Sequence, residues 1–87
     1  MIDNNRRKLH MEYPCRWIYK IIGTDQDAME AAVAEIIRDR PCEISFSRRS
    51  EKARYVSLDV KLLVESESHR MDLYIALKAH PAIKIVL

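Results

Sequence analysis

The 87-residue sequence has little of what marks flexible, disulfide-bonded or membrane-spanning chains. It contains one glycine, three prolines and two cysteines, and 48% of its residues are hydrophobic. This composition argues against disorder and low complexity. No apolar run approaches the roughly 20 residues that span a bilayer. We therefore expect a compact chain without a membrane span.

The cysteines and the N-terminus indicate a reducing compartment. Cys15 and Cys42 are widely spaced, and no apolar segment follows the basic residues near the start, as a signal peptide would require. We expect a cytoplasmic protein with a flexible N-terminal tail, residues 1–12, and a single domain, residues 13–87. The net charge of +2 is too small to indicate nucleic-acid binding by itself.

The longest strand pattern runs from Arg54 to Val64. Its residues alternate with a period of two, which is typical of a half-buried strand. The apolar side consists of Val56, Leu58, Val60, Leu62 and Val64, and the other side carries Tyr55, Ser57, Asp59 and Lys61. We expect the rest of the chain to cover or pair with this strand.

Other segments supply the remaining elements. Residues 16–22 predict an interior strand because both faces are largely apolar. Gly23 ends this strand, and Thr24 with Asp27 resembles a capping box for a helix that Pro41 stops near residue 40. A second strand is expected over 42–49, a second helix from Ser66 or Ser68 to about residue 79, and a last strand over 82–87. The first helix carries one apolar stripe, formed by Met29, Ala32, Val33, Ile36 and Ile37.

The second helix has apolar residues on two sides. At about 100° per residue, Leu73 and Leu77 lie on one side, and Met71 and Ile75 lie roughly opposite. Either the buried stripe is wide and Tyr74 bridges it, which we favour, or Met71 and Ile75 form a candidate interface for a partner.

The order β-α-β-β-α-β predicts an α+β fold. It matches a ferredoxin-like two-layer sandwich, a four-stranded antiparallel sheet with two helices on one face. We expect the first and third strands side by side in the centre and parallel to each other, with the second and fourth at the edges. The face away from the helices is expected to be open and polar.

Several short patterns from Tyr13 onward resemble one known family. They are Tyr13-Pro14, Tyr19-Lys20, Gly23, the Ser50/Lys52/Tyr55/Ser57 pattern, Leu73-Tyr74 with Leu77, and Val86-Leu87. In these the chain is similar to the YbeD family of small bacterial proteins, although its hairpin is shorter and carries Arg48 and Arg49. The resemblance implies an ACT-like sandwich, the fold of regulatory modules that bind amino acids or pair beside enzymes. It implies no established activity.

The residue inventory predicts no enzyme, metal site or cofactor. The loop after the first strand is acidic, which does not suit the phosphate cradle of an acylphosphatase, and the only asparagines, Asn4 and Asn5, lie in the tail. The three histidines have no short spacing with one another or with the cysteines, as metal sites usually do.

Two binding functions stay open. We favour a non-enzymatic regulatory or interaction module that binds a protein partner, a second copy of itself or a small metabolite, because small sheets have edge strands that invite pairing. Its candidate ligand loop is Gly23, Thr24 and Asp25, although a turn that needs glycine explains this loop more simply. The less favoured alternative is nucleic-acid binding by the predicted hairpin, whose basic residues are Arg48, Arg49, Lys52 and Arg54. Only Tyr55 is placed to stack a base.

Overall fold

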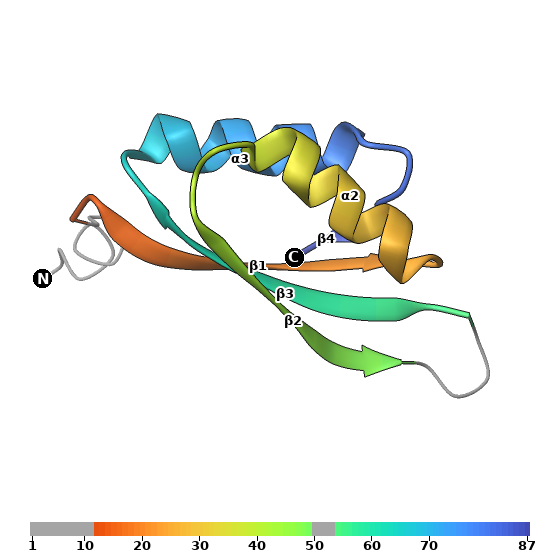
Figure 1. Ribbon diagram of the computed structural model, residues 1–87. Helices are drawn as coiled ribbons and strands as arrows, with labels where there is room; N and C mark the ends of the chain where they lie inside the picture. Colours follow the sequence, from red (N-terminus) through yellow and green to blue (C-terminus); the bar gives the residue numbers. More distant parts are fainter. Residues whose placement is uncertain (1–11, 50–53) are drawn as a thin grey trace, which may run out of the picture.

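The chain folds into a sheet covered on one face by two helices. The computed structural model describes residues 12–49 and 54–87. The elements are β1 (Cys15–Gly23), α2 (Gln26–Ile37), β2 (Cys42–Arg49), β3 (Val56–Val64), α3 (Glu67–Ala79) and β4 (Ile85–Val86). The sheet order is β2-β3-β1-β4, and both helices lie on the same side of it (Figure 1). The predicted ferredoxin-like order is confirmed, and the predicted tail lies outside the described residues except for Glu12.

The two central strands run in opposite directions. β1 and β3 pair antiparallel from Cys15 opposite Val64 to Gly23 opposite Val56. The expectation that they are parallel was wrong. The two strands joined by each helix are parallel, but they are not neighbours in the sheet. β3 lies between β1 and β2, and β1 lies between β3 and β4. Because the β2–β3 hairpin reverses the chain, β1 and β3 must be antiparallel.

The core lies between the helices and the apolar side of the two central strands. Ile21, Leu58, Val60 and Val64 have no exposed surface. On α2 the buried residues are Met29, Ala32, Val33 and Ile37, with Ile36 partly buried against them. The period-two and helical patterns therefore identified the central part of the core correctly.

The ends of α2 differ from the predicted ones. Asp25, not Thr24, is the N-cap, and its carboxylate accepts a hydrogen bond from the Ala28 amide at 3.2 Å. The helix ends at Ile37 rather than near residue 40. Arg38 has a φ of 63°, and its amide donates to the Ala34 carbonyl at 2.9 Å. A left-handed residue at this position stops the helix before Pro41 does.

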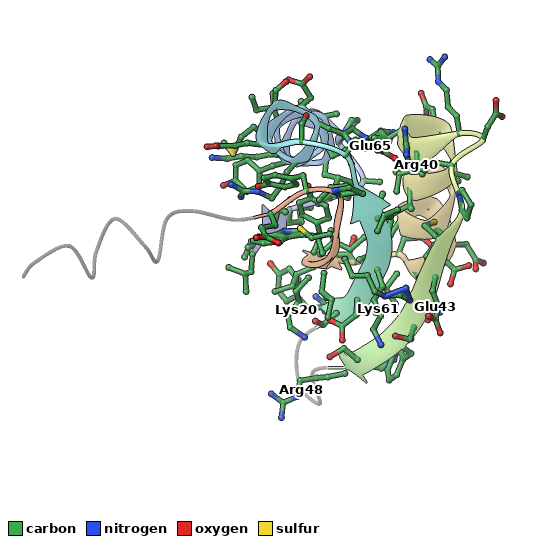
Figure 2. The ribbon with its side chains drawn as sticks, turned by 90° about the vertical axis from the view of Figure 1, so that its left-hand side faces the viewer. Lys20, Arg40, Glu43, Arg48, Lys61 and Glu65 are labelled. Carbon is green, nitrogen blue, oxygen red and sulfur yellow. The ribbon has the colours of Figure 1, made fainter. Side chains whose placement is uncertain are left out.

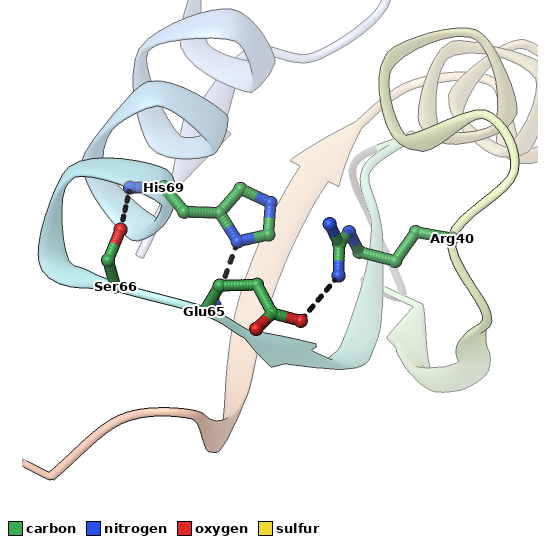
Figure 3. Close-up of polar contacts among 4 residues, drawn as sticks. All are labelled: Arg40, Glu65, Ser66 and His69. Carbon is green, nitrogen blue, oxygen red and sulfur yellow. Dashed lines mark hydrogen bonds and ion pairs between the residues drawn. The ribbon is translucent and has the colours of Figure 1, made fainter.

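The start of α3 is fixed by polar contacts (Figure 3). Ser66 caps the helix, as one of the two predicted serines, and its hydroxyl accepts from the His69 amide at 3.1 Å. The Nδ1 atom of His69 accepts from the Glu65 amide at 3.0 Å. The Glu65 carboxylate also meets the Arg40 guanidinium at 3.0 Å, which links the turn before α3 to the segment after α2.

The last strand is much shorter than predicted. Only Ile85 and Val86 of the expected 82–87 strand pair with β1, opposite Ile22 and Ile21. Leu87 adds two backbone hydrogen bonds with Lys20, of 3.2 and 2.8 Å. Beyond that point, toward Cys15, the same edge of β1 has no neighbouring strand within residues 12–49 and 54–87.

Among the described residues, neither helix is long and apolar enough to cross a membrane.

Candidate functional site

The predicted ligand loop is packed against the protein itself. A Cβ atom on Gly23 would lie 2.6 Å from the Ala82 carbonyl oxygen and 2.8 Å from the Met29 sulfur. Glycine is therefore required here for close packing, since its φ is not positive. The Asp25 carboxylate already occupies the start of α2, where an anionic ligand would bind. The ligand role of Gly23, Thr24 and Asp25 stays a prediction, and the structure gives this loop a packing reason.

The predicted basic hairpin does not present its charges on one surface. Arg48 pairs with Ser57 and Arg49 with Val56, so the two arginines lie on opposite faces of the sheet. Arg54 precedes β3, and Lys52 lies outside the described residues. An interface that used both Arg48 and Arg49 would have to reach both faces of the sheet.

The candidate interface on α3 is exposed. Met71 is 40% and Ile75 58% exposed, whereas Leu73 and Leu77 are buried. The favoured interpretation, a wide buried stripe, was wrong, because Met71 and Ile75 lie on the side of α3 opposite Leu73 and one sheet cannot cover both sides of a helix.

Met71 belongs to an apolar cleft at the edge of the sheet. The cleft has a volume of about 320 Å³ and lies between α3 and the free edge of β1. We call it the edge cleft; its lining residues are Trp17, Ile18, Tyr19, Arg70, Met71, Tyr74 and Leu87. Ile18 and Leu87 are 54% and 68% exposed. The edge cleft thus gathers apolar side chains that have no cover in the described protein.

Arg70 organises the inner wall of the edge cleft. Its guanidinium carbon lies 4.6 Å from the centre of the Trp17 ring, within cation–π range. Its Nε donates to the Tyr13 hydroxyl at 3.1 Å, and this hydrogen bond raises the pKa of Arg70. Arg70 therefore stays charged, and both its ring contact and its hydrogen bond hold it against β1.

Tyr19 ties the same turn of α3 to the strand. Its hydroxyl donates to the Arg70 carbonyl oxygen at 2.6 Å. Burial raises the pKa of Tyr19 to about 12, and the positive charge of Arg70 partly opposes this shift. The neutral phenol is therefore the form that joins α3 to β1.

Two backbone positions of β1 face the open edge beside this cleft. Lys20 bonds to Leu87 through both its N–H and its C=O. Backbone groups of alternate residues point to the same side of an antiparallel strand, so those of Ile18 and Arg16 point to this edge too. Within the described residues, no strand lies opposite them. The edge cleft is therefore bordered by free hydrogen-bonding groups.

The sheet face away from the helices is only partly polar. By register, Ile18, Ile22 and Ile85 lie on this face, together with Leu63, which is 42% exposed. The expectation of a polar face holds for the part formed by β2 and β3, where Ser45 pairs with Asp59 and Glu43 with Lys61. The part formed by β1 and β4 is mixed, because Ile18, Ile22 and Ile85 lie there beside the charged Arg16 and Lys20.

The described residues contain no group of three or more His, Cys, Asp and Glu side chains that could hold a metal ion. Both cysteines are free thiols. Burial raises the pKa of the Cys42 thiol, whereas a reactive cysteine needs a lowered pKa. The Cys42 thiol therefore lacks the lowered pKa of a reactive cysteine.

Sequence reasoning missed Arg70, Trp17 and Ile18 as parts of one site. Arg70 is distant from β1 in the sequence and meets Trp17 only after α3 has packed on the strand. Two sequence observations pointed toward this site: small sheets have edge strands that can pair, and Met71 lies on the side of its helix opposite Leu73. No local sequence pattern connects the two observations.

Comparison with known proteins identifies the family. A family model described as "Protein of unknown function (DUF493)" matches residues 8–87. The chain belongs to the DUF493 family. A UPF0250 protein of Hahella chejuensis is 32% identical over 91 aligned positions that span all of both chains. A UPF0250 protein of Neisseria gonorrhoeae is 29% identical over the whole of both chains. These findings confirm the resemblance to YbeD-like proteins.

A solved relative supports the DUF493 fold. The solution structure of protein HP0495 from Helicobacter pylori superposes with a TM-score of 0.80 and covers 100% of this chain and 96% of its own. At 24% identity it supports the fold alone. The family description and the names of these relatives state no activity.

Proposed function

We propose that this DUF493 protein is a non-enzymatic interaction module that binds a partner protein at the edge cleft by strand addition. The observation that carries the proposal is the free backbone of Arg16 and Ile18 beside an apolar cleft. A regulatory role would act through the partner bound at this edge.

Strand addition uses two features that occur together here. An extended segment gains affinity from main-chain hydrogen bonds and specificity from pockets for its alternate side chains. On the helix side, a segment next to β1 would meet Met71 and Tyr74. On the opposite side it would meet Ile18 and Leu87, which are both exposed. A partner segment with apolar residues at alternate positions fits these surfaces.

The second predicted function has weaker geometric support. Nucleic-acid binding needs cations along one surface, but Arg48 and Arg49 lie on opposite faces of the sheet. Glu43 and Asp59 share the open face with Lys20 and Lys61, so acidic groups interrupt any basic track across it.

The test is to block the backbone hydrogen bonds of this edge and to correct for the loss of the Ile18 side chain. Ile18→Pro removes an N–H that points away from β3, so the β1–β3 ladder keeps its hydrogen bonds. The matched control, Ile18→Ala, keeps the N–H and shortens the side chain. We expect Ile18→Ala, which shortens one cleft side chain, to capture less partner protein from lysate than the wild-type protein, and Ile18→Pro to capture none. Circular dichroism checks that all three proteins fold.

Hydrogen exchange provides a second readout on the complex. The amides of Arg16 and Ile18 should exchange fast in the free protein and become protected when the partner binds, whereas Trp17 and Tyr19, which face β3, should be slow in both states. Sedimentation of the protein alone, performed first, shows whether a second copy takes the edge. Retention of the partner by Ile18→Pro, or unchanged exchange at Arg16 and Ile18, would refute strand addition.

A further inference from the structure

A second hollow lies on the opposite side of the molecule from the helices. Its volume is about 480 Å³. We call it the sheet-face pocket; it is lined by Lys20, Ile22, Ser47, Arg48, Tyr55, Val56 and Ser57. It shares no residue with the edge cleft, and nothing said above about partner binding depends on it.

A β-bulge forms the polar wall of this pocket. The register between β2 and β3 shifts between Phe46, opposite Leu58, and Arg48, opposite Ser57. A bulge re-aims side chains that would otherwise alternate between faces. Ser47 accepts a hydrogen bond from the Lys20 ammonium at 2.9 Å, and Arg48 shares the face of Ser57. The side chains of Ser47 and Arg48, although consecutive in the sequence, therefore lie on the same face of the sheet.

The charges in the pocket are unevenly satisfied. The Lys20 ammonium lies 2.9 Å from the Asp59 carboxylate as well as 2.9 Å from Ser47, which uses two of its three protons. The Arg48 side chain has no ion pair or hydrogen bond within the described part of the chain. Figure 2 shows Lys20 and Arg48 projecting from the same side of the sheet, away from the helices. The guanidinium and the third Lys20 proton thus remain available for an anion.

The rest of the lining suits a small organic molecule. The Tyr55 side chain is 46% exposed and offers an aromatic face, and Ile22 adds an apolar surface beside Ser57. A volume of this size is within the usual range of small-molecule sites, about 300 to 1,000 Å³. One cationic end and one apolar end specify a ligand with an anionic head and an apolar body.

We propose that the sheet-face pocket binds a small organic anion, either a phosphate monoester or a carboxylate, whose charged group pairs with Arg48. The planar fork of arginine matches both kinds of oxyanion through paired N–H donors. Lys20 supplies the second cation, and the hydroxyls of Ser47 and Ser57 complete the polar side. The body of the ligand lies along Ile22 and the Tyr55 ring.

The probes are phenyl phosphate, benzoate, inorganic phosphate and phenol, titrated into the isotope-labelled full chain and followed by NMR. We expect phenyl phosphate or benzoate to shift the amides of Ser47, Arg48 and Ser57, and the stronger of the two identifies the oxyanion. Inorganic phosphate should bind more weakly because it lacks the apolar body, and phenol should not bind. Shifts centred on another surface, or no saturable shift with either aromatic anion, would overturn the proposal.

Neighbouring arginines provide a matched pair of variants. Arg48→Gln should raise the dissociation constant of the better anion about tenfold, as expected for one lost charge-assisted contact. Arg49→Gln makes the same charge change on the other face of the sheet and should change this dissociation constant by less than about twofold. Equal weakening by both variants would mean that general hairpin charge attracts the anion, and the site would be rejected.

Discussion

The two halves of β1 have different surroundings although they belong to one strand. From Tyr19 to Gly23 the strand is buried or half-buried, with β3 on one side and the β4 segment on the other. From Arg16 to Ile18, β3 is the one neighbouring strand within the described residues. Ile22 and Ile18 lie on the same sheet face, yet Ile22 is half-buried beside Ile85, and Ile18 is 54% exposed. The short β4 thus divides β1 into a half that is paired on both sides and a half that is paired on one side within the described residues.

The largest effect should separate the two halves directly. Ile21→Ala removes a side chain with no exposed surface and should lower the free energy of unfolding by about 3 to 4 kcal/mol through lost burial and a cavity. Ile18→Ala should lower it by only about 0.5 kcal/mol, as for surface positions. Urea denaturation of both variants measures the difference. Similar losses at the two positions would show that the free half also supports the core.

A smaller loss is expected where the buried half ends. Gly23→Ala places a methyl group against the Ala82 carbonyl, which is backbone and cannot rotate away. Overpacking of this kind costs about 1 to 3 kcal/mol. Thermal unfolding of the variant measures the loss, and a Met29→Leu/Gly23→Ala double variant serves as a control that changes the flexible neighbour but keeps the carbonyl. Wild-type stability in Gly23→Ala would contradict the close approach of β1 and residue 82.

The smallest effect concerns Tyr19, at the junction of the halves, and depends on pH. Its pKa is raised to about 12 in the folded protein and is about 10 in an unfolded chain. Between these values the unfolded chain loses the proton and the folded chain keeps it. Stability is therefore complete below about pH 10 and falls as pH rises, by up to about 1.4 kcal/mol per pH unit.

Tyr19→Phe should remove this contribution. Urea unfolding of the wild-type protein and the variant at about pH 9, 10 and 11 isolates it, because the other titrating groups are common to both. The stability of the wild-type protein should approach that of the variant as pH rises. A constant difference across this range would mean that Tyr19 titrates normally.

Local patterns predicted most of the fold. The spacing of apolar residues located the central strands and the buried stripe of α2, since periodicity depends on near neighbours in the sequence. The wrong predictions concerned features that depend on residues distant in the sequence. Whether residues 82–87 pair fully depends on how the chain leaves α3. Whether Met71 is covered depends on which side of α3 faces the sheet. The choice of Asp25 over Thr24 as N-cap is a one-residue difference that propensity does not resolve.

The candidate sites were less predictable than the fold. Met71 and Ile75 were recognised because a helical projection places them opposite Leu73. The edge cleft needed Trp17 and Arg70 together, and the sheet-face pocket needed the bulge at Ser47, which no sequence signal marked. Arg48 was noted as a cation, but its separation from Arg49 depends on register.

The antiparallel pairing of β1 with β3 also has a kinetic consequence. Every pair in this ladder joins residues more than thirty positions apart, because α2 and β2 lie between the two strands in the chain. The β2–β3 hairpin closes a far shorter loop. Since non-local pairing must overcome loop-closure entropy before its contacts form, we expect the β1–β3 ladder to form after the β2–β3 hairpin and to limit the folding rate.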